Sequence, residues 1–134
     1  MHRSLGVCAF VLIALATGCS DPTKGEVSGT ITVDGNPAKT GSIGFFPIDG
    51  NGQTSGAKIV EGTYTATVSV GKSRVEIRVP KKVGEQKIYN TPDSPIQDLL
   101  EESLPAKFNT ESELVYEVTS GKSVKDFELS TKKK

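Results

Sequence analysis

The amino-acid sequence predicts an all-β domain, a seven-stranded antiparallel β-sandwich with one short helix in the long loop before the last hairpin. Three observations support this class. Apolar and polar side chains alternate in many short segments, turn-forming pairs such as Asp34-Gly35 and Glu61-Gly62 separate these segments, and no long helical period competes with them. The chain is long enough for one domain with a single core.

Each expected strand rests on this alternation. In the clearest one, Tyr64, Ala66 and Val68 alternate with hydroxyl residues, as in a half-buried strand. In 73–79 the outer face is charged, which suits an exposed or edge position. The last two strands are expected to form a hairpin around Ser120-Gly121-Lys122-Ser123. In chain order the seven strands are expected at 26–33, 42–47, 57–60, 64–70, 73–79, 113–118 and 124–129.

The interval 80–112 is too long for a plain loop in a compact domain, so it should contain structure or serve a purpose. A short amphipathic helix is expected at 94–105. Ser94 occupies the N-cap position, Pro95 the first helical position and Gln97 the capping-box position. Apolar residues at helical spacing follow until Pro105 ends the run, namely Ile96, Leu99, Leu100 and Leu104.

The N-terminus resembles the lipoprotein signal of bacterial envelope proteins. A short positive segment precedes an apolar stretch, Leu5 to Ala16, which is too short to span a bilayer as a stable helix. Ala16-Thr17-Gly18-Cys19 then fits the lipobox, which predicts lipidation of Cys19. Ser20 follows the cysteine, as in lipoproteins exported to the outer membrane. The expected organisation is a signal peptide at 1–18, a lipidated N-terminus and linker at 19–25, the sandwich at 26–130 and a basic tail at 131–134.

A second cleavage site competes with the lipobox. Ala14-Leu15-Ala16 fits an ordinary signal peptidase, which would release a soluble protein carrying Cys19 near its N-terminus. We favour lipidation, because a free thiol in an oxidising compartment would be a reactive leftover. Two or more acyl chains would give stable membrane attachment.

Composition argues against most catalytic classes and against nucleic-acid binding. Sixteen basic and sixteen acidic residues cancel, and the only histidine and one of the two cysteines, His2 and Cys8, lie in the leader. The mature domain therefore lacks the usual base for a serine or cysteine nucleophile, and it cannot form a histidine metal site. We expect no enzymatic activity, no catalytic residue and no cofactor. The carboxylates Asp98, Glu101 and Glu102 are interpreted as a solvated face.

Two weaker patterns are candidates for binding sites. Asp49 and Asn51, like Asp34 and Asn36, have the alternate oxygen ligands that calcium accepts, but Asp-Gly-Asn is also ordinary turn chemistry, and we favour turns with no metal. Tyr89 with its neighbour Asn90 is the better candidate for an exposed partner contact. Phe108 is expected to be buried under the sandwich edge.

The placed strands resemble small bacterial envelope lipoproteins whose mature part is a carboxypeptidase-regulatory-like, or transthyretin-like, β-sandwich. The matching stretches cover most of the mature chain: VSGTITVDGNPAKTGSIGFFP from Val27, AKIVEGTYTATVSVGKSRVEIRVP from Ala57 and LPAKFNTESELVYEVTSGKSVKDFEL from Leu104. They are similar to the family's V-x-G-x-V-x-x-D-G-x-P opening, its G-x-Y strand entry and its P-x-K-[YF]-N segment. The resemblance implies an immunoglobulin-like or transthyretin-like sandwich in the cell envelope, and no catalytic residue.

These observations predict a lipid-anchored, non-enzymatic β-sandwich module of the cell envelope with a binding or structural role. The alternative is a soluble periplasmic or secreted accessory domain that binds calcium or a glycan. Expected partners are membrane lipid, through acylated Cys19, and an envelope protein or glycan, with no nucleic acid and a monomeric domain. Alternating strands should place the N-terminus and the Asp49 loop at one end of the sandwich, and the excursion 80–112 with the Asp34 turn at the other.

Overall fold

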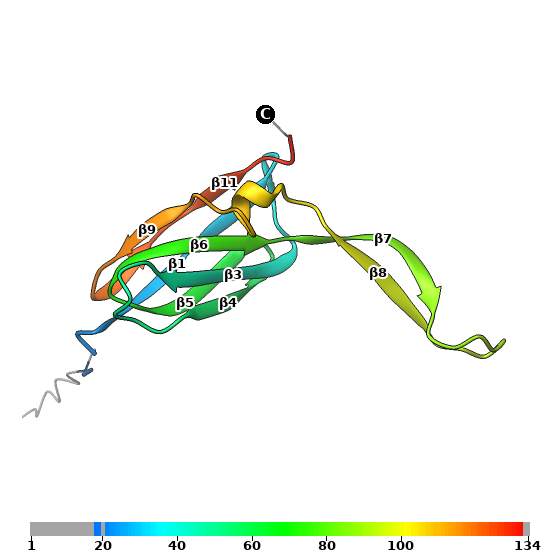
Figure 1. Ribbon diagram of the computed structural model, residues 1–134, viewed down its shortest axis with the longest axis horizontal. Coiled ribbons are helices and arrows are strands. Elements are labelled where there is room, and N and C mark those ends of the chain that lie inside the picture. Colours follow the sequence, from blue (N-terminus) through cyan, green and yellow to red (C-terminus); the bar gives the residue numbers. More distant parts are fainter. Residues whose placement is uncertain (1–17, 20, 133–134) are drawn as a thin grey trace, which may run out of the picture.

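A computed structural model describes residues 18, 19 and 21–132 of the chain. Residues 1–17, Ser20 and the last two lysines of the tail lie outside the described residues. The predicted signal peptide, except for Gly18, and the predicted sorting residue Ser20 are therefore outside them. The described part is all-β, as predicted: strands form two sheets, and the one helical element there is the 3-10 turn η1 (Ala106–Phe108) (Figure 1). No described helix is long and apolar enough to cross a membrane.

The larger sheet has nine strands and curls into two layers, which together are called the body. In one layer β1 lies between β5 on one side and, on the other side, β10 followed along the strand by β11. The other layer has the strand order β4-β3-β6-β9. Only the pair Val60 and Thr63 joins β4 to β5, so the sheet folds over at that turn. The strands are β1 (Lys24–Val33), β2 (Asn36–Pro37), β3 (Thr40–Pro47), β4 (Ser55–Val60), β5 (Thr63–Ser69), β6 (Gly71–Arg78), β9 (Val115–Val118), β10 (Gly121–Val124) and β11 (Phe127–Leu129).

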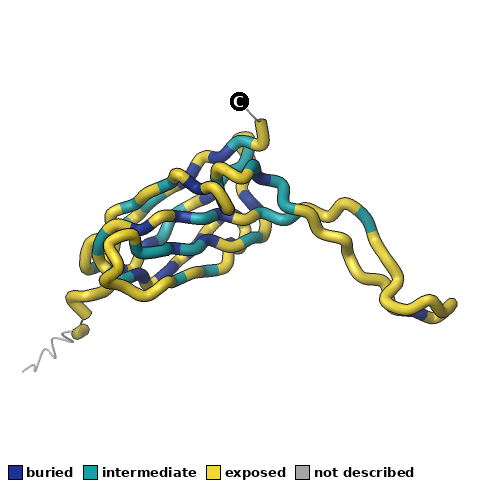
Figure 2. The backbone as a smooth tube through the Cα atoms, in the orientation of Figure 1, coloured by how far each residue is buried: buried dark blue, intermediate teal, exposed yellow. Residues whose placement is uncertain are grey.

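The core lies between the two layers, where the alternation predicted it (Figure 2). Successive side chains of a strand point to opposite faces, so every second residue is buried. In β5, Tyr64, Ala66 and Val68 are buried and the residues between them are exposed. Phe45 and Ile77 from the other layer are fully buried in the same cluster. Burial of apolar area of this kind is the main favourable term in folding.

The predicted exposed face of β6 is present, although β6 is not an edge strand, because β3 and β9 flank it. Arg74 and Arg78 point outward with Glu76 between them, and both guanidinium groups form ion pairs with its carboxylate. Such exposed pairs contribute little to stability. They keep the outer face of the layer polar.

The prediction of a hairpin between the last two strands is wrong. β9 pairs with β6, whereas β10 and β11 pair in parallel with β1 in the other layer. The chain crosses between the layers directly over Gly25, where a Cβ atom would lie 2.1 Å from the carbonyl oxygen of Thr119. A glycine at this position allows the close crossing. Alternation within each segment gave no information about this tertiary contact.

The expected position of the helix is also wrong. The segment that contains it forms β8 (Ile96–Glu102), which pairs antiparallel with β7 (Pro80–Lys87) in a separate two-stranded sheet. This hairpin, residues 80–102, projects from the body and is called the arm (Figure 1). Ser94 accepts the N–H of Tyr89 across the arm's tip rather than capping a helix. The short helix of the predicted fold class is present as η1, just after Pro105.

The predicted distribution of the ends is confirmed. At one end the N–H of Val70 donates to Thr23, and the N–H of Ile48 donates to Lys72, which joins the N-terminus to the loop before Asp49. At the other end the N–H of Asp34 donates to Leu129. The arm leaves the body at this second end, and the tip of the arm and the N-terminal end of the body lie toward opposite extremes of the molecule's longest axis (Figure 1).

Candidate functional site

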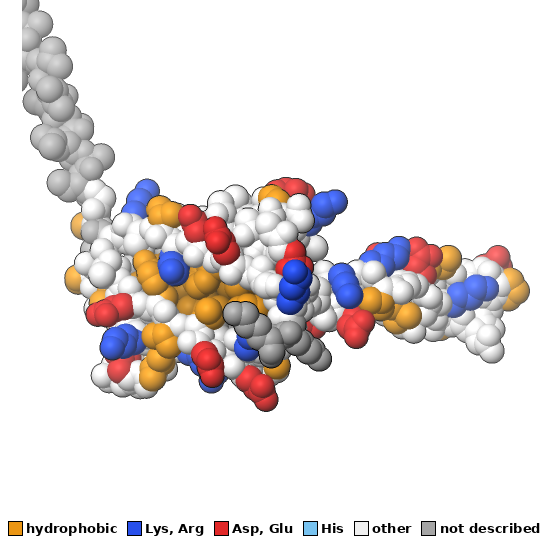
Figure 3. All heavy atoms as spheres, turned by 90° about the horizontal axis from the view of Figure 1, so that it is seen from above, with side chains coloured by type: hydrophobic (Ala, Val, Ile, Leu, Met, Phe, Trp, Pro, Cys, Tyr) orange, Lys and Arg blue, Asp and Glu red, His pale blue; other side chains and the backbone are white. Residues whose placement is uncertain are grey.

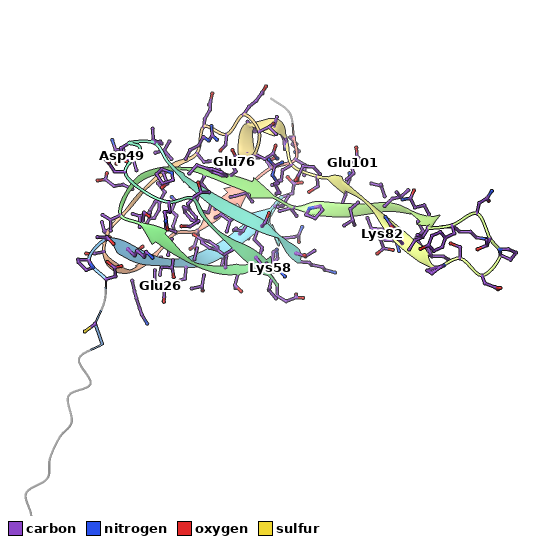
Figure 4. The ribbon with its side chains drawn as sticks, turned by 60° about the horizontal axis from the view of Figure 1, so that its bottom comes forward. Glu26, Asp49, Lys58, Glu76, Lys82 and Glu101 are labelled. Atoms are coloured by element: carbon purple, nitrogen blue, oxygen red, sulfur yellow. The ribbon has the colours of Figure 1, made fainter. Side chains whose placement is uncertain are left out.

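The arm has two distinct faces, which follow from its register. Directly paired residues share a face, and successive residues of a strand alternate between faces. Ile96, Asp98 and Leu100 lie on one face together with their partners Lys87, Glu85 and Lys82. Gln97, Leu99 and Glu101 lie on the other face. Figure 4 shows Lys82 and Glu101 on opposite sides of the arm, in agreement with this register.

Ion pairs hold the first face together. The ammonium group of Lys82 lies 2.8 Å from the carboxylate of Asp98 and also contacts Glu85. Hydrogen bonds to these two carboxylates raise the pKa of Lys82 above its ordinary value. All three side chains are solvent-exposed, so the pairs order the face without adding much stability.

The arm exposes large apolar side chains along its whole length. Tyr89 is 64% exposed, Leu100 62% and Ile96 61%, and hydrophobic side chains stand between charged ones on the arm in Figure 3. A two-stranded hairpin that packs on nothing is marginally stable in water. The arm therefore presents exposed apolar side chains on a sheet that pairs with no strand of the described body.

The base of the arm is firmly attached to the body. One carboxylate oxygen of Glu102 accepts the backbone N–H groups of Val79 and Leu104, each at 3.0 Å. The N–H and hydroxyl of Ser103 both donate to the carbonyl of Val79. Leu104, the next residue, is buried in the core. These contacts fix the direction in which the arm leaves the body.

A groove of about 520 Å³ runs between the base of the arm and the outer face of β3 and β4. Lys58 and Arg78 line it from the body, and Leu100 and Glu101 line it from the arm. The groove presents both signs of charge beside an apolar side chain. This combination suits a polypeptide segment of mixed charge better than a purely anionic ligand.

The predicted site residues lie at separate places. Tyr89 and Asn90 are exposed at the tip of the arm, where their role as a partner contact stays a prediction. Asp98 pairs with Lys82, while Glu102 supports the arm's base, so the three predicted carboxylates do not form one solvated face. Phe108 is half-buried and packs against the core. Sequence reasoning did not identify the ion pairs of Lys82 or the exposure of Leu100. The lysines of β7 and the acidic residues of β8 were a signal that these two segments pair.

Cys19 is exposed and not disulfide-bonded, and it precedes β1 at the end of the molecule remote from the arm. The residues from Asp21 to Lys24, which lead into β1, form a turn. The carboxylate of Asp21 accepts both the N–H and the hydroxyl of Thr23, and the N–H of Lys24 donates to the carbonyl of Asp21. The two hydrogen bonds from Thr23 to the carboxylate lower the pKa of Asp21. The turn shortens the distance between Cys19 and the body.

The weak calcium candidates occupy turns at opposite ends of the body. Asn51 lines a shallow hollow together with Lys24, whose positive charge opposes a cation there. Asp34 instead accepts the N–H and hydroxyl of Thr131, which fastens the start of the tail and lowers the pKa of Asp34. Among the described residues, no three acidic, histidine or cysteine side chains gather as a metal site would require.

The fold and the arm define a two-layered β-sandwich with a projecting β-hairpin. No family model, curated protein or solved structure matches the chain. The fold class therefore rests on the arrangement of the strands themselves.

Proposed function

We propose that the protein is a lipid-anchored, non-enzymatic module of the bacterial cell envelope that binds a partner through its arm. The observation that carries the binding role is the arm itself, a two-stranded sheet with exposed apolar side chains that pairs with no strand of the described body. The anchor rests on the lipobox ending at Cys19.

The placement of the two functional parts supports this proposal. The N-terminal end of β1, which Cys19 precedes, and the arm lie toward opposite ends of the longest axis. A lipid-attached cysteine with a short linker that contains a turn would keep the N-terminal end of the body close to the membrane and leave the arm at the end remote from the anchor. The arm would then be available to an envelope protein or a glycan on the periplasmic face or at the outer membrane.

The anchor is tested by replacing Cys19 with serine in the full chain. We expect the unsubstituted protein in the membrane fraction, with a mature N-terminus at a diacylated Cys19 by mass spectrometry, and the Cys19→Ser protein in the soluble fraction or unprocessed. Acyl chains contribute about 0.8 kcal/mol per buried CH₂, so their loss should abolish stable attachment.

A matched control is Thr17→Ser, which keeps a small residue two positions before the cysteine. It should leave the fractionation unchanged. A mature N-terminus at Thr17, or an unmodified Cys19 in the unsubstituted protein, would show that the ordinary signal peptidase site is used and the protein is soluble.

A further inference from the structure

The two edges of the arm differ in how well they are protected against pairing with another strand. Edge strands are commonly protected by lysine, proline and β-bulges. β7 has all three: Pro80 begins it, Lys81, Lys82 and Lys87 lie along it, and a bulge interrupts it at Val83. β8 carries acidic side chains, but it contains neither lysine nor proline, and the bulge lies in β7 rather than in β8. The free edge of β8 is therefore the open one.

The backbone groups on this edge can be identified from the hydrogen bonds at its two ends. The carbonyl of Pro95 accepts the N–H of Ile88, and the N–H of Ser103 donates to Val79. Odd-numbered residues of β8 thus direct their backbone groups toward β7. The even-numbered residues Ile96, Asp98 and Leu100 direct theirs outward, where no strand of the described chain pairs with them.

We propose that a second copy of this chain pairs with the open edge of β8, antiparallel and centred on Leu99, to form one four-stranded sheet from two arms. This inference names the partner of the contact surface proposed above and rests on that role of the arm. A twofold axis through Leu99 pairs residue i with residue 198 − i. A sheet of four strands also removes the weakness of an isolated hairpin.

The charge pattern of β8 fits this register. No two like charges lie directly opposite each other: Asp98 faces Leu100 of the second copy, Glu101 faces Gln97 and Glu102 faces Ile96. Within each arm Leu100 pairs with Lys82 on the same face. In the joint sheet, Leu100 of one copy therefore lies between Lys82 of its own arm and Asp98 of the other copy. The pairing thus adds charge complementarity to the backbone hydrogen bonds.

The other symmetric edge pairing is less favourable. Pairing β7 with β7 of a second copy would bring two sets of three lysines together across a bulged strand that starts with proline. The register through β8 instead places the two bodies at opposite ends of the joint sheet, and the tip of each arm, with Tyr89, lies beside the base of the other.

Cysteine cross-linking of the full chain tests the proposal. Leu99 faces itself in a non-hydrogen-bonded pair, where the Cα atoms are about 4.5 Å apart, within the range for a disulfide. Leu99→Cys should therefore give a covalent dimer under mild oxidation, both in envelopes and in detergent extracts. Val83→Cys is the matched control: it is also exposed, but it lies on the outer strand of the joint sheet, so its dimer yield should be about tenfold lower or less.

A second substitution tests the edge without breaking the hairpin. Leu100→Pro removes an N–H that points outward, so it should abolish the Leu99→Cys cross-link while the β7–β8 pairing remains. The unsubstituted chain corrects for any disulfide through Cys19. Equal dimer yields from Leu99→Cys and Val83→Cys, or a cross-link that survives Leu100→Pro, would overturn the proposal.

The result is separable from the proposed function. A cross-linked product containing a different protein, or no product while the arm still retains an envelope partner, would leave the arm as a contact surface but show that a second copy is not what covers it. A monomeric domain was the expectation from sequence alone, and it is the result that contradicts this inference.

Discussion

Tyr64 links the core to the break between β10 and β11. Its ring packs between Phe45 and Phe127, and its hydroxyl donates a hydrogen bond of 2.6 Å to the carbonyl of Lys125. That carbonyl lies against Gly29, where a Cβ atom would come within 2.0 Å of it. One tyrosine thus fixes the position at which the last part of the chain passes over β1.

The buried state of Tyr64 predicts a decline of stability at alkaline pH. Burial, with smaller contributions from Tyr116 and Asp126, raises the pKa of Tyr64 far above its ordinary value of 10.0. As the pH rises through about 10, the Tyr64 phenol then ionises only in the unfolded state. The free energy of unfolding therefore keeps its full value below this pH and falls above it, by up to about 1.4 kcal/mol per pH unit.

Urea unfolding of the native protein and of Tyr64→Phe at pH 8 to 11 measures this effect. At pH 8 the variant should be less stable by about 1 kcal/mol, the usual worth of one hydrogen bond. Above pH 10 the difference should shrink, because phenylalanine cannot ionise. Tyr89→Phe makes the same chemical change at an exposed site and controls for the loss of one phenol. A difference that is constant from pH 8 to 11 would contradict the prediction.

The arm is an element that the body does not need in order to fold. None of the residues 81–101 belongs to the core cluster, and Pro80 pairs directly with Glu102 at the arm's base. Replacing 82–100 with Asn-Gly, between the directly paired Lys81 and Glu101, should therefore leave the free energy of unfolding undiminished, since a shorter connection also costs less closure entropy.

Urea unfolding compares this shortened chain with the complete one. Ile59→Ala, at a core position, is the control for sensitivity and should cost about 2 to 5 kcal/mol. If shortening the arm lowered the free energy of unfolding by a similar amount, the arm would stabilise the body, which would contradict the prediction.

Most strands of the body could be predicted from sequence because they bury one face, whereas β2 and β10 lie in segments that were expected to be turns. Alternation then records burial directly, as it does from Tyr64 to Val68. The arm has no buried face, so this signal was absent, and the apolar residues from Ile96 to Leu104 happened to match a helical period. Ser94 and Pro95, which matched the start of a helix, instead lie just before β8, where Ser94 accepts the N–H of Tyr89. The segment is a strand because it pairs with β7.

The candidate site was accessible to sequence reasoning only in part. Tyr89 was identified as an uncommitted aromatic residue, and it lies at the arm's tip. The open edge of β8 could not be identified, because it depends on which backbone groups face outward and on the bulge in β7. Such features belong to strand pairing rather than to residue type.

At the scale of the whole molecule, the arm is the part that should decide which partners are retained. The complete chain and the shortened chain, each solubilised from envelopes in the same detergent, provide the comparison. We expect proteins or glycans that co-purify with the complete chain to be lost from the shortened one. Recovery of the same partners by both chains would assign the contact surface to the body instead.

The position of β1 has a mechanical consequence. β1 follows the predicted anchor directly, and it is paired along most of its length with β5 on one side and with β10 and β11 on the other. Tension between a lipid-held N-terminus and a partner on the arm would pull β1 along its own axis, so its hydrogen bonds would be loaded in shear and share the force. This arrangement should resist stretching along the line that joins the predicted anchor to the proposed contact surface on the arm.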